Sequence, residues 1–382
     1  MPLKILIVPD KFKGTLTAGE AARAIARGWR KARPHDGFDL LPMSDGGDGF
    51  GEVIGNLVGA RSLSVKTIDA AHRPCKSRWW WEAKSKTAVI ESANVVGLAM
   101  LPEGKFHPFE LDTFGLGEVV RAAASKGAKR CIIGIGGSAT NDGGFGLARS
   151  LGWRFLDRDG HAINRWTELH RLAGARAPRK QSWFDELIVA VDVQNSLLGI
   201  RGATRVYGPQ KGLRTFDLEP AGRALRGLAR AVQKYSGKNL SRVPGTGAAG
   251  GLGFGLLAFL GGRLESGFDL FARLSNLDQR LRSVDLVITG EGKLDESTLM
   301  GKGTGEIAWR CRKLKTPCLG LAGEISGRNG ILRFFTTIHA LTDLISLDRA
   351  KSNPEIFLGQ LTRRVAANWP SSSGIQRLRP GP

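Results

Sequence analysis

The sequence predicts an α/β protein with two α/β domains and with its ligand site in the cleft between them. Short apolar runs alternate with helical segments, which is typical of βαβ units and a parallel sheet. The strands expected near the two chain ends are alike, and they flank a long middle region with strands of its own. Glycine-rich polar loops follow several strands, and open α/β sheets bind ligands at the carboxyl ends of their strands.

The N-terminal segment predicts one strand–helix–strand unit. Residues 3–8 are aliphatic and β-branched, which is typical of a buried strand. A helix is expected over residues 17–31, because Thr17 can cap it and Glu20 can complete a capping box. Residues 38–42 follow as the next strand.

Further strands and helices are expected along the rest of the chain. The strands are residues 87–91, 130–135, 187–191, 286–289, 318–322 and 337–341, and the helices are residues 117–124 and 305–314. We therefore expect a discontinuous first domain over residues 1–65 and 280–368, with residues 66–279 inserted as the second. Residues 369–382 are rich in Ser, Pro and Arg, which indicates a disordered basic tail.

Composition excludes several classes of protein. The formal net charge is +21, but Lys and Arg are spread along the chain, so we expect a solvated basic surface and no nucleic-acid partner. The four cysteines form no C-x-x-C pair, which is the usage of a cytoplasmic protein. Residues 243–262 are uncharged, but eight of these twenty residues are glycine, so we expect a glycine loop and a buried helix instead of a membrane span.

The first two of five candidate loops carry lysines and carboxylates. Residues 9–15 (PDKFKGT) follow the first strand, and lysines in such a loop can meet phosphate. Residues 44–49 (SDGGDG) place two carboxylates among three glycines, which suits magnesium or substrate hydroxyls. A solvated turn is the alternative for each loop.

The third loop, residues 134–144 (GIGGSATNDGG), indicates an anion site made of backbone N–H groups. It also matches the G-x-G-x-x-A dinucleotide fingerprint over Gly134–Ala139, with Asp157 about twenty residues on. The loop continues through Asn141-Asp142-Gly143-Gly144, so a helix cannot begin tightly at the third fingerprint position. Because the fingerprint matches but the helix start does not, an NAD-dependent oxidoreductase is kept only as an alternative.

The fourth and fifth loops supply further carboxylates. Asp192 and Asn195 follow a strand, and Asp192 can serve as a catalytic base or a metal ligand. Residues 289–295 (TGEGKLD), with Gly301-Lys302-Gly303 shortly after, combine carboxylates, lysines and backbone amides, which fits phosphate with magnesium. No P-loop, H-R-D loop, G-x-S-x-G elbow or H-E-x-x-H motif is present.

These loops, in this order, resemble the bacterial glycerate kinase family, and the resemblance covers nearly the whole chain. The matching stretches are PDKFKGTLTA (9–18), SDGGDG (44–49), IGIGGSATNDGG (133–144), AVDVQN (190–195), GPQKG (208–212), PGTGAAGGLGFGLLAFLGG (244–262) and DLVITGEGKLDESTLMGKG (285–303). The resemblance implies a flavodoxin- or Rossmann-like domain beside a different α/β domain. It also implies ATP, Mg²⁺ and phosphorylation of D-glycerate, mainly at the 2-hydroxyl.

Roles are then predicted for residues of these loops. Asp192 is the first choice for the catalytic base, with Asp45 as runner-up and Lys13 as a further catalytic residue. The substrate-binding residues are Asp10, Gly46, Gly47, Asn195 and Lys211. ATP is expected at Gly136, Gly137, Ser138, Thr140, Asn141, Asp142 and Gly290. Magnesium is expected at Glu291 and Asp295.

Some positions depart from the family pattern and leave the finer specificity open. Ser196 stands where the family usually has proline, Gly303-Thr304 where it has Ala-Pro, and Asp48 where it tends to have glutamate. A 3-phosphoglycerate-forming kinase remains an alternative to the 2-phosphoglycerate-forming one. A basic nucleic-acid binder without catalytic activity is a third, weaker interpretation.

Overall fold

The chain divides into two units, each built around its own sheet. The computed structural model describes residues 1–179, 182–299 and 303–370. Unit 1 comprises Met1–Asp45 with Phe271–Pro382, and unit 2 comprises Gly46–Leu270. These boundaries lie earlier than the expected ones near residues 65 and 280. The first lies earlier because α2 (Phe50–Leu57), which the sequence assigned to the first domain, packs on two strands of unit 2.

Unit 1 contains a five-stranded parallel sheet in the order β13-β12-β11-β1-β2. This is the 2-1-3-4-5 order of flavodoxin-like folds, read from the β2 edge. Strands from both ends of the chain share this sheet, as the sequence predicted. The strands are β1 (Lys4–Ile7), β2 (Gly37–Leu40), β11 (Leu286–Leu294), β12 (Cys318–Ile325) and β13 (Thr337–Ala340).

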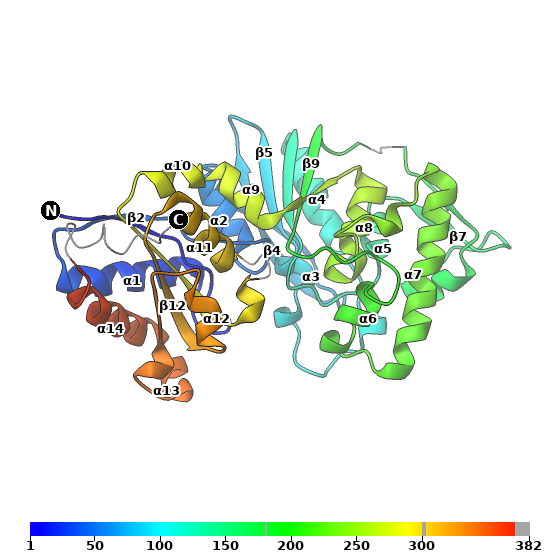
Figure 1. The fold of residues 1–382 in the computed structure, drawn as a ribbon. Helices are drawn as coiled ribbons and strands as arrows, with labels where there is room; N and C mark the ends of the chain where they lie inside the picture. The colour runs from blue at the N-terminus through cyan, green and yellow to red at the C-terminus, as the bar shows by residue number, and fades with distance from the viewer. Residues whose placement is uncertain (180–181, 300–302, 371–382) are drawn as a thin grey trace. The chain divides into compact units, whose positions relative to one another are not determined.

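Helices cover this sheet, and one pair packs very closely. α1 (Ala18–Ala32) and α14 (Pro354–Ala367) lie side by side (Figure 1), and a Cβ atom at Gly28 would come within 2.2 Å of the Gly359 carbonyl oxygen. Thr17 caps α1 in a capping box with Glu20, as predicted. The other helices assigned here are α10 (Leu277–Arg282), α11 (Gly303–Leu314), α12 (Arg328–Leu332) and α13 (Leu347–Ser352), and α9 (Gly267–Leu274) spans the boundary.

Two expectations for this unit are corrected. The strand expected over residues 286–289 continues to Leu294, because β12 extends as far and pairs with it. Trp369, placed in a disordered tail, is buried, and its ring lies 6.0 Å from that of Trp29. The tail prediction is therefore wrong at its first residue, while residues 371–382 lie outside the described residues.

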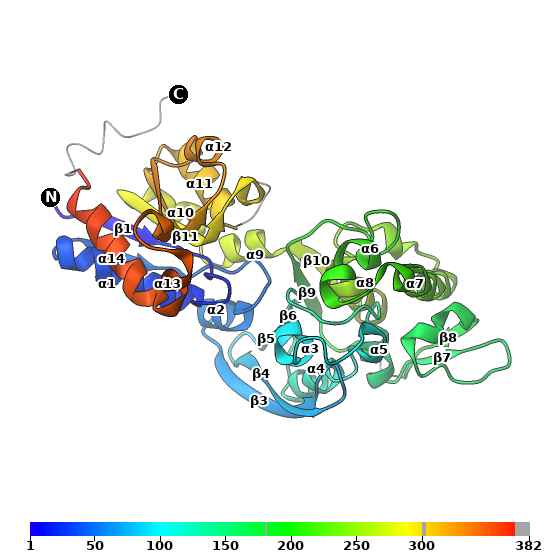
Figure 2. The ribbon, with the colours of Figure 1, turned by 90° about the horizontal axis from the view of Figure 1, so that it is seen from below.

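Unit 2 contains a six-stranded mixed sheet in the order β10-β9-β6-β5-β4-β3. β5, β6, β9 and β10 run parallel, whereas β3 and β4 form a long antiparallel hairpin that curves along one edge (Figure 2). The strands are β3 (Arg61–Ile68), β4 (Pro74–Glu82), β5 (Thr87–Glu91), β6 (Arg130–Gly134), β9 (Glu186–Val191) and β10 (Arg263–Ser266), with a separate pair, β7 (Arg154–Leu156) and β8 (Gly174–Arg176).

The helices of unit 2 range from one turn in α3 to 22 residues in α7. Gly51 and Gly55 of α2 leave room for the Trp80 ring, which would meet a Cβ atom at either position. The remaining helices are α3 (Ala93–Val96), α4 (Leu116–Ser125), α5 (Phe145–Ser150), α6 (Ala203–Tyr207), α7 (Thr215–Ser236) and α8 (Ala248–Leu260).

The glycine-rich stretch that leads into the buried part of α8 contains a kink. Ala249, Gly250 and Gly251 adopt left-handed backbone angles inside the helix, and the buried helical part follows them. Across the described residues, no helix is long and apolar enough to cross a membrane. All four cysteines are free.

Candidate active site

Three carboxylates of unit 1 gather where its strand order reverses. β1 lies between β11 and β2, and the order of the strands along the chain reverses at β1. Open α/β sheets bind ligands at such a reversal, beyond the carboxyl ends of the strands. Asp10 follows β1, and its backbone N–H donates to the Gly290 carbonyl oxygen at 2.8 Å. Glu291 lies on β11 and Asp45 follows β2, so these carboxylates come from three neighbouring strands.

The electrostatics of Asp10 are unusual. Burial and the charge of Asp45 raise the pKa of Asp10 to about 7, and Glu291 adds to the effect while Lys11 opposes it. A carboxyl group kept half protonated at neutral pH costs stability, because its charged form is disfavoured by burial and like charges. Such perturbed groups cluster at functional sites, since positive charge from a ligand or metal can relieve them.

A threonine that the sequence did not single out links Glu291 to Asp295. The Thr298 hydroxyl donates to Glu291 Oε1 at 3.1 Å and accepts from the Asp295 backbone N–H at 3.2 Å. The two residues proposed for magnesium are thus joined by one buried side chain. The sequence signal for this contact was a Thr three residues after an Asp, because Thr side chains often hydrogen-bond to nearby backbone groups.

Other predicted residues of unit 1 have different surroundings. Lys13 is exposed at the tip of a tight turn, where its backbone lies against Gly292. Gly290 serves strand packing, because a Cβ atom there would come within 2.0 Å of the Leu321 carbonyl oxygen. Lys293 pairs with Glu324 at 3.3 Å, while Lys302 lies outside the described residues.

In unit 2, a buried glutamate holds the second half of the SDGGDG loop. Glu91, at the end of β5, accepts from the backbone N–H groups of Gly49 and Gly51, each at 2.9 Å. Gly46 lies against the end of β9, because a Cβ atom on it would come within 3.2 Å of the Ala190 carbonyl oxygen. The sequence-based interpretation treated Glu91 as a strand residue and missed this function.

The loop after β6 is only partly accessible. Gly136 and Gly137 reach the surface, whereas Ser138, Thr140, Asn141 and Asp142 are buried. Gly136 donates its N–H to the Gly46 carbonyl oxygen at 2.9 Å, so the two glycine loops touch. A Cβ atom on Gly137 would come within 2.3 Å of Asp48 Oδ1. Within the predicted nucleotide loop, the structure therefore leaves only Gly136 and Gly137 accessible.

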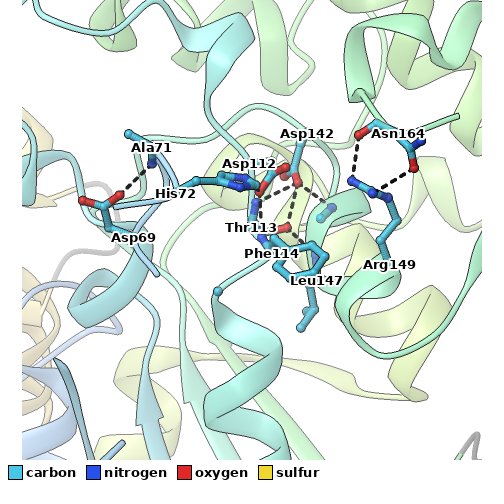
Figure 3. A network of polar contacts seen from close by, with 12 residues as sticks. Asp69, Ala71, His72, Asp112, Thr113, Phe114, Asp142, Leu147, Arg149 and Asn164 are labelled. Carbon is cyan, nitrogen blue, oxygen red and sulfur yellow. Dashed lines mark hydrogen bonds and ion pairs between the residues drawn. The ribbon is translucent and has the colours of Figure 1, made fainter. Parts of the chain in front are cut away.

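Asp142 organises this loop from inside (Figure 3). Its Oδ2 accepts from the N–H and hydroxyl of Thr113 and from the Gly146 N–H, and its Oδ1 accepts from the Gly144 N–H. Burial and the nearby Asp112 raise the pKa of Asp142. Figure 3 also shows His72 against Asp112, a hydrogen bond that raises the pKa of His72.

Lys211, predicted to bind substrate, is buried. Its Nζ donates to the Thr140 carbonyl oxygen at 2.6 Å. Burial lowers the pKa of Lys211 to about 7, although the charge of Asp142 opposes the shift. Asn141 donates to the Thr204 hydroxyl at 3.1 Å, while its Oδ1 has no partner among the described residues.

Asp192 is exposed just after β9, as its predicted role requires. Asn195, by contrast, is committed within the unit: it donates to the Arg201 carbonyl oxygen at 2.7 Å and accepts from the Tyr207 hydroxyl at 2.6 Å. Burial and the charge of Asp192 raise the pKa of Tyr207 to about 12, so this phenol stays a hydrogen-bond donor. Asn195 therefore braces the loop that carries Asp192.

The dinucleotide interpretation loses its structural basis. α5 begins at Phe145, six residues after Ala139, so no helix N-terminus meets the third fingerprint position. Asp157 lies beside β7, where it accepts from the backbone N–H groups of Asp159 and His161. It thus closes a local turn after β7, which belongs to a separate two-stranded sheet and not to the sheet of β6. The fingerprint requires its acidic residue at the end of a strand beside β6.

Comparison with known proteins decides the family. The model of the glycerate kinase family matches residues 5–370. This chain belongs to the glycerate kinase family. The "Glycerate kinase" of Halalkalibacterium halodurans is 36% identical over 97% of this chain and 99% of its own length. The "Glycerate 2-kinase" of Escherichia coli is 34% identical over 96% and 97%.

A solved structure of the family has the same fold. A crystal structure described as glycerate kinase 2 from Salmonella typhimurium LT2 is 32% identical, covers 98% of this chain and 100% of its own, and superimposes with a TM-score of 0.82. The chain is therefore an enzyme of the kinase class, with the two-domain α/β architecture of the family.

Proposed function

We propose that this enzyme transfers the γ-phosphoryl group of ATP to the 2-hydroxyl of D-glycerate and releases 2-phosphoglycerate. Family membership supports glycerate as substrate, and the relative named glycerate 2-kinase supports the 2-hydroxyl. The observation that carries the proposal is the gathering of Asp10, Asp45 and Glu291 at the strand-order reversal of unit 1, where burial and the neighbouring charges raise the pKa of Asp10. Phosphoryl transfer depends mainly on positioning and on charge neutralisation, and these carboxylates suit both tasks.

Magnesium fits the oxygen ligands of unit 1. Mg²⁺ is usually held by one or two carboxylates together with substrate phosphates. Glu291 and Asp295 remain the proposed metal residues, since the Thr298 hydroxyl holds the Glu291 carboxylate and the Asp295 backbone, and Asp10 is the third candidate. The ion supplies positive charge that neutralises phosphate oxygens. The raised pKa of Asp10 supports a cation nearby, because a cation would restore the charged carboxylate.

Asp192 is the proposed base in unit 2. Its side chain is exposed at the end of β9, so a substrate hydroxyl can reach it, while Asn195 and Tyr207 stiffen the loop behind it. A positioned carboxylate that accepts the hydroxyl proton is what phosphoryl transfer to an alcohol requires. Gly46 and Gly47 beside this strand end are proposed to contact the substrate through their backbones.

The deciding experiment combines the enzyme with ATP, Mg²⁺ and D-glycerate and follows the product by ³¹P and ¹³C NMR. We expect ADP and 2-phosphoglycerate in equal amounts. A 3-phosphoglycerate signal would replace the 2-hydroxyl by the 3-hydroxyl and leave the reaction class intact. Turnover of glycerate with NAD and no ADP formation would instead reject the kinase assignment.

Chelation gives the metal control. With EDTA in excess, ADP formation is expected to stop and to return when Mg²⁺ is added. Magnesium alone should raise the melting temperature of the wild type, because it binds the folded state. That shift should shrink in Glu291→Gln, while the matched surface variant Glu52→Gln keeps it.

A further inference from the structure

Lys211 occupies a position that does not suit a residue reaching for an exposed phosphate. It ends the short turn Pro209–Lys211, and its side chain is buried, with 7% of its surface exposed. Its Nζ donates a hydrogen bond to the buried backbone carbonyl oxygen of Thr140. Buried lysines are rare, and burying an ammonium costs free energy. A buried amine is a costly partner for one backbone carbonyl, which indicates a role beyond packing.

The carbonyl that Lys211 holds belongs to the glycine loop after β6. Gly250 lies against the same oxygen, because a Cβ atom there would come within 1.9 Å of it. The Thr140 N–H in turn donates to the Ser138 hydroxyl at 3.1 Å. Ser138 directly follows Gly137, which is the exposed part of the loop. The hydrogen bond from Lys211 therefore fixes a short, stiff path that ends at the accessible glycines.

We propose that Lys211 is a positioning residue: from behind, it holds the Thr140 carbonyl, and thereby shapes the loop at the exposed Gly137, whose backbone receives an anionic group of a substrate. The inference rests on the proposed function, since it needs an anionic substrate at this loop. The anionic group is a phosphate of ATP or the carboxylate of glycerate. The substrate whose KM changes in the test below identifies which of the two binds there.

The first test replaces the amine by a side chain of similar length that cannot donate. In Lys211→Met, the KM for one substrate should rise about tenfold or more, which is the usual effect of losing a hydrogen bond from a charged group. The melting temperature should change little, because removal of a buried amine offsets the loss of a partner for the Thr140 carbonyl. Lys234→Met, the same change at an exposed position of α7, should alter neither KM nor melting temperature.

The second test needs only the wild type. Both the ammonium and the neutral amine of Lys211 can donate to a carbonyl, so a positioning role predicts a KM nearly constant from pH 7 to pH 9. Phosphate groups are already doubly ionised above about pH 6. The charged group that acts on Lys211 is Asp142, whose own pKa is raised by burial and by the nearby Asp112.

Two outcomes would overturn the proposal. A KM that climbs steadily between pH 7 and pH 9 would mean that the ammonium itself meets the substrate. Unchanged KM and kcat in a folded Lys211→Met variant would mean that the brace is irrelevant to the reaction. If the wild type instead fails to phosphorylate glycerate, the proposed function fails first, so the two failures are distinguishable.

Discussion

The Glu91 carboxylate accepts a 2.9 Å hydrogen bond from the Gly49 N–H, and its other oxygen accepts an equal one from Gly51. One buried side chain at the end of β5 thereby fixes the start of α2 and the glycine loop before it. Both oxygens act as acceptors, so the residue must be a carboxylate and not an amide.

Glu91→Gln should therefore damage the enzyme although it preserves shape. Its NH₂ group would face a backbone N–H, which leaves a buried donor unsatisfied and costs about 1–3 kcal/mol. We expect a lower melting temperature and a kcat/KM reduced about tenfold or more. Steady-state kinetics and thermal melts measure both effects. Glu52→Gln, on the exposed face of α2, is the matched control, and an equally small effect of both changes would contradict this role.

Asp192→Asn should remove the proposed base. We expect kcat to fall about a hundredfold or more, because general base catalysis typically supplies that much. ATP and glycerate affinities should stay near wild type, as calorimetry can check. The control is Asp185→Asn, an exposed aspartate directly before the first residue of β9, which should leave kcat unchanged. Turnover within a few-fold of wild type in folded Asp192→Asn would move the role to Asp45.

Asp10→Asn should stabilise the protein while it inactivates the enzyme. The folded pKa of Asp10, about 7, lies above the unfolded value of 3.8, so the folded state holds an extra proton between them. The stability contributed by this group is therefore full below about pH 4 and is lost as the pH rises to about 7. The variant should escape that loss, so its advantage in urea melts should grow from pH 4 to pH 7.

The same comparison tests the functional side of Asp10. Loss of activity together with gained stability is the expected signature of a residue strained for function. A variant with normal kcat and KM would show that Asp10 is not part of the site. A stability difference independent of pH would show that its pKa is not raised.

Gly137→Ala tests the accessible part of the loop after β6. Gly137 has φ +75°, and a Cβ atom would lie 2.3 Å from Asp48 Oδ1. Gly59 has φ +71° with no atom within 4 Å, so Gly59→Ala carries only the backbone strain, about 1–2 kcal/mol. Both variants should melt earlier than wild type, but only Gly137→Ala should raise a substrate KM. Equal KM values in the two variants would remove Gly137 from the site.

Local patterns in the sequence predicted several elements closely. The capping box of Thr17 and Glu20 lies where expected, and the strand over residues 87–91 has the predicted bounds. Such features depend on neighbours within a few residues or on continuous apolar runs, so they can be read from the sequence. The family motifs likewise indicated the kinase class, since they span nearly the whole chain.

Long-range pairing was beyond the sequence pattern. β11 runs to Leu294 only because β12 continues beside it, and glycines at 290 and 323 let the two strands approach. A stretch of glycines and charges suggests a loop when its partner strand is unknown. The kink at residues 249–251 is a similar case, because its left-handed angles follow from close packing on the Thr140–Gly143 backbone.

By itself, the sequence determined the α/β class, the shared sheet of the chain ends and the family, and it predicted the loops that are proposed to carry the chemistry. Only the tertiary structure decided which side chains of those loops face outward. Asp192 and Lys13 are exposed, whereas Lys211 and Asp142 are buried and bonded within unit 2. The same structure revealed Glu91 and Thr298 as hydrogen-bonding partners of the loops. Burial and hydrogen-bond partners depend on residues far apart in the chain, so residue type and spacing alone cannot distinguish a ligand-binding lysine from a buried brace.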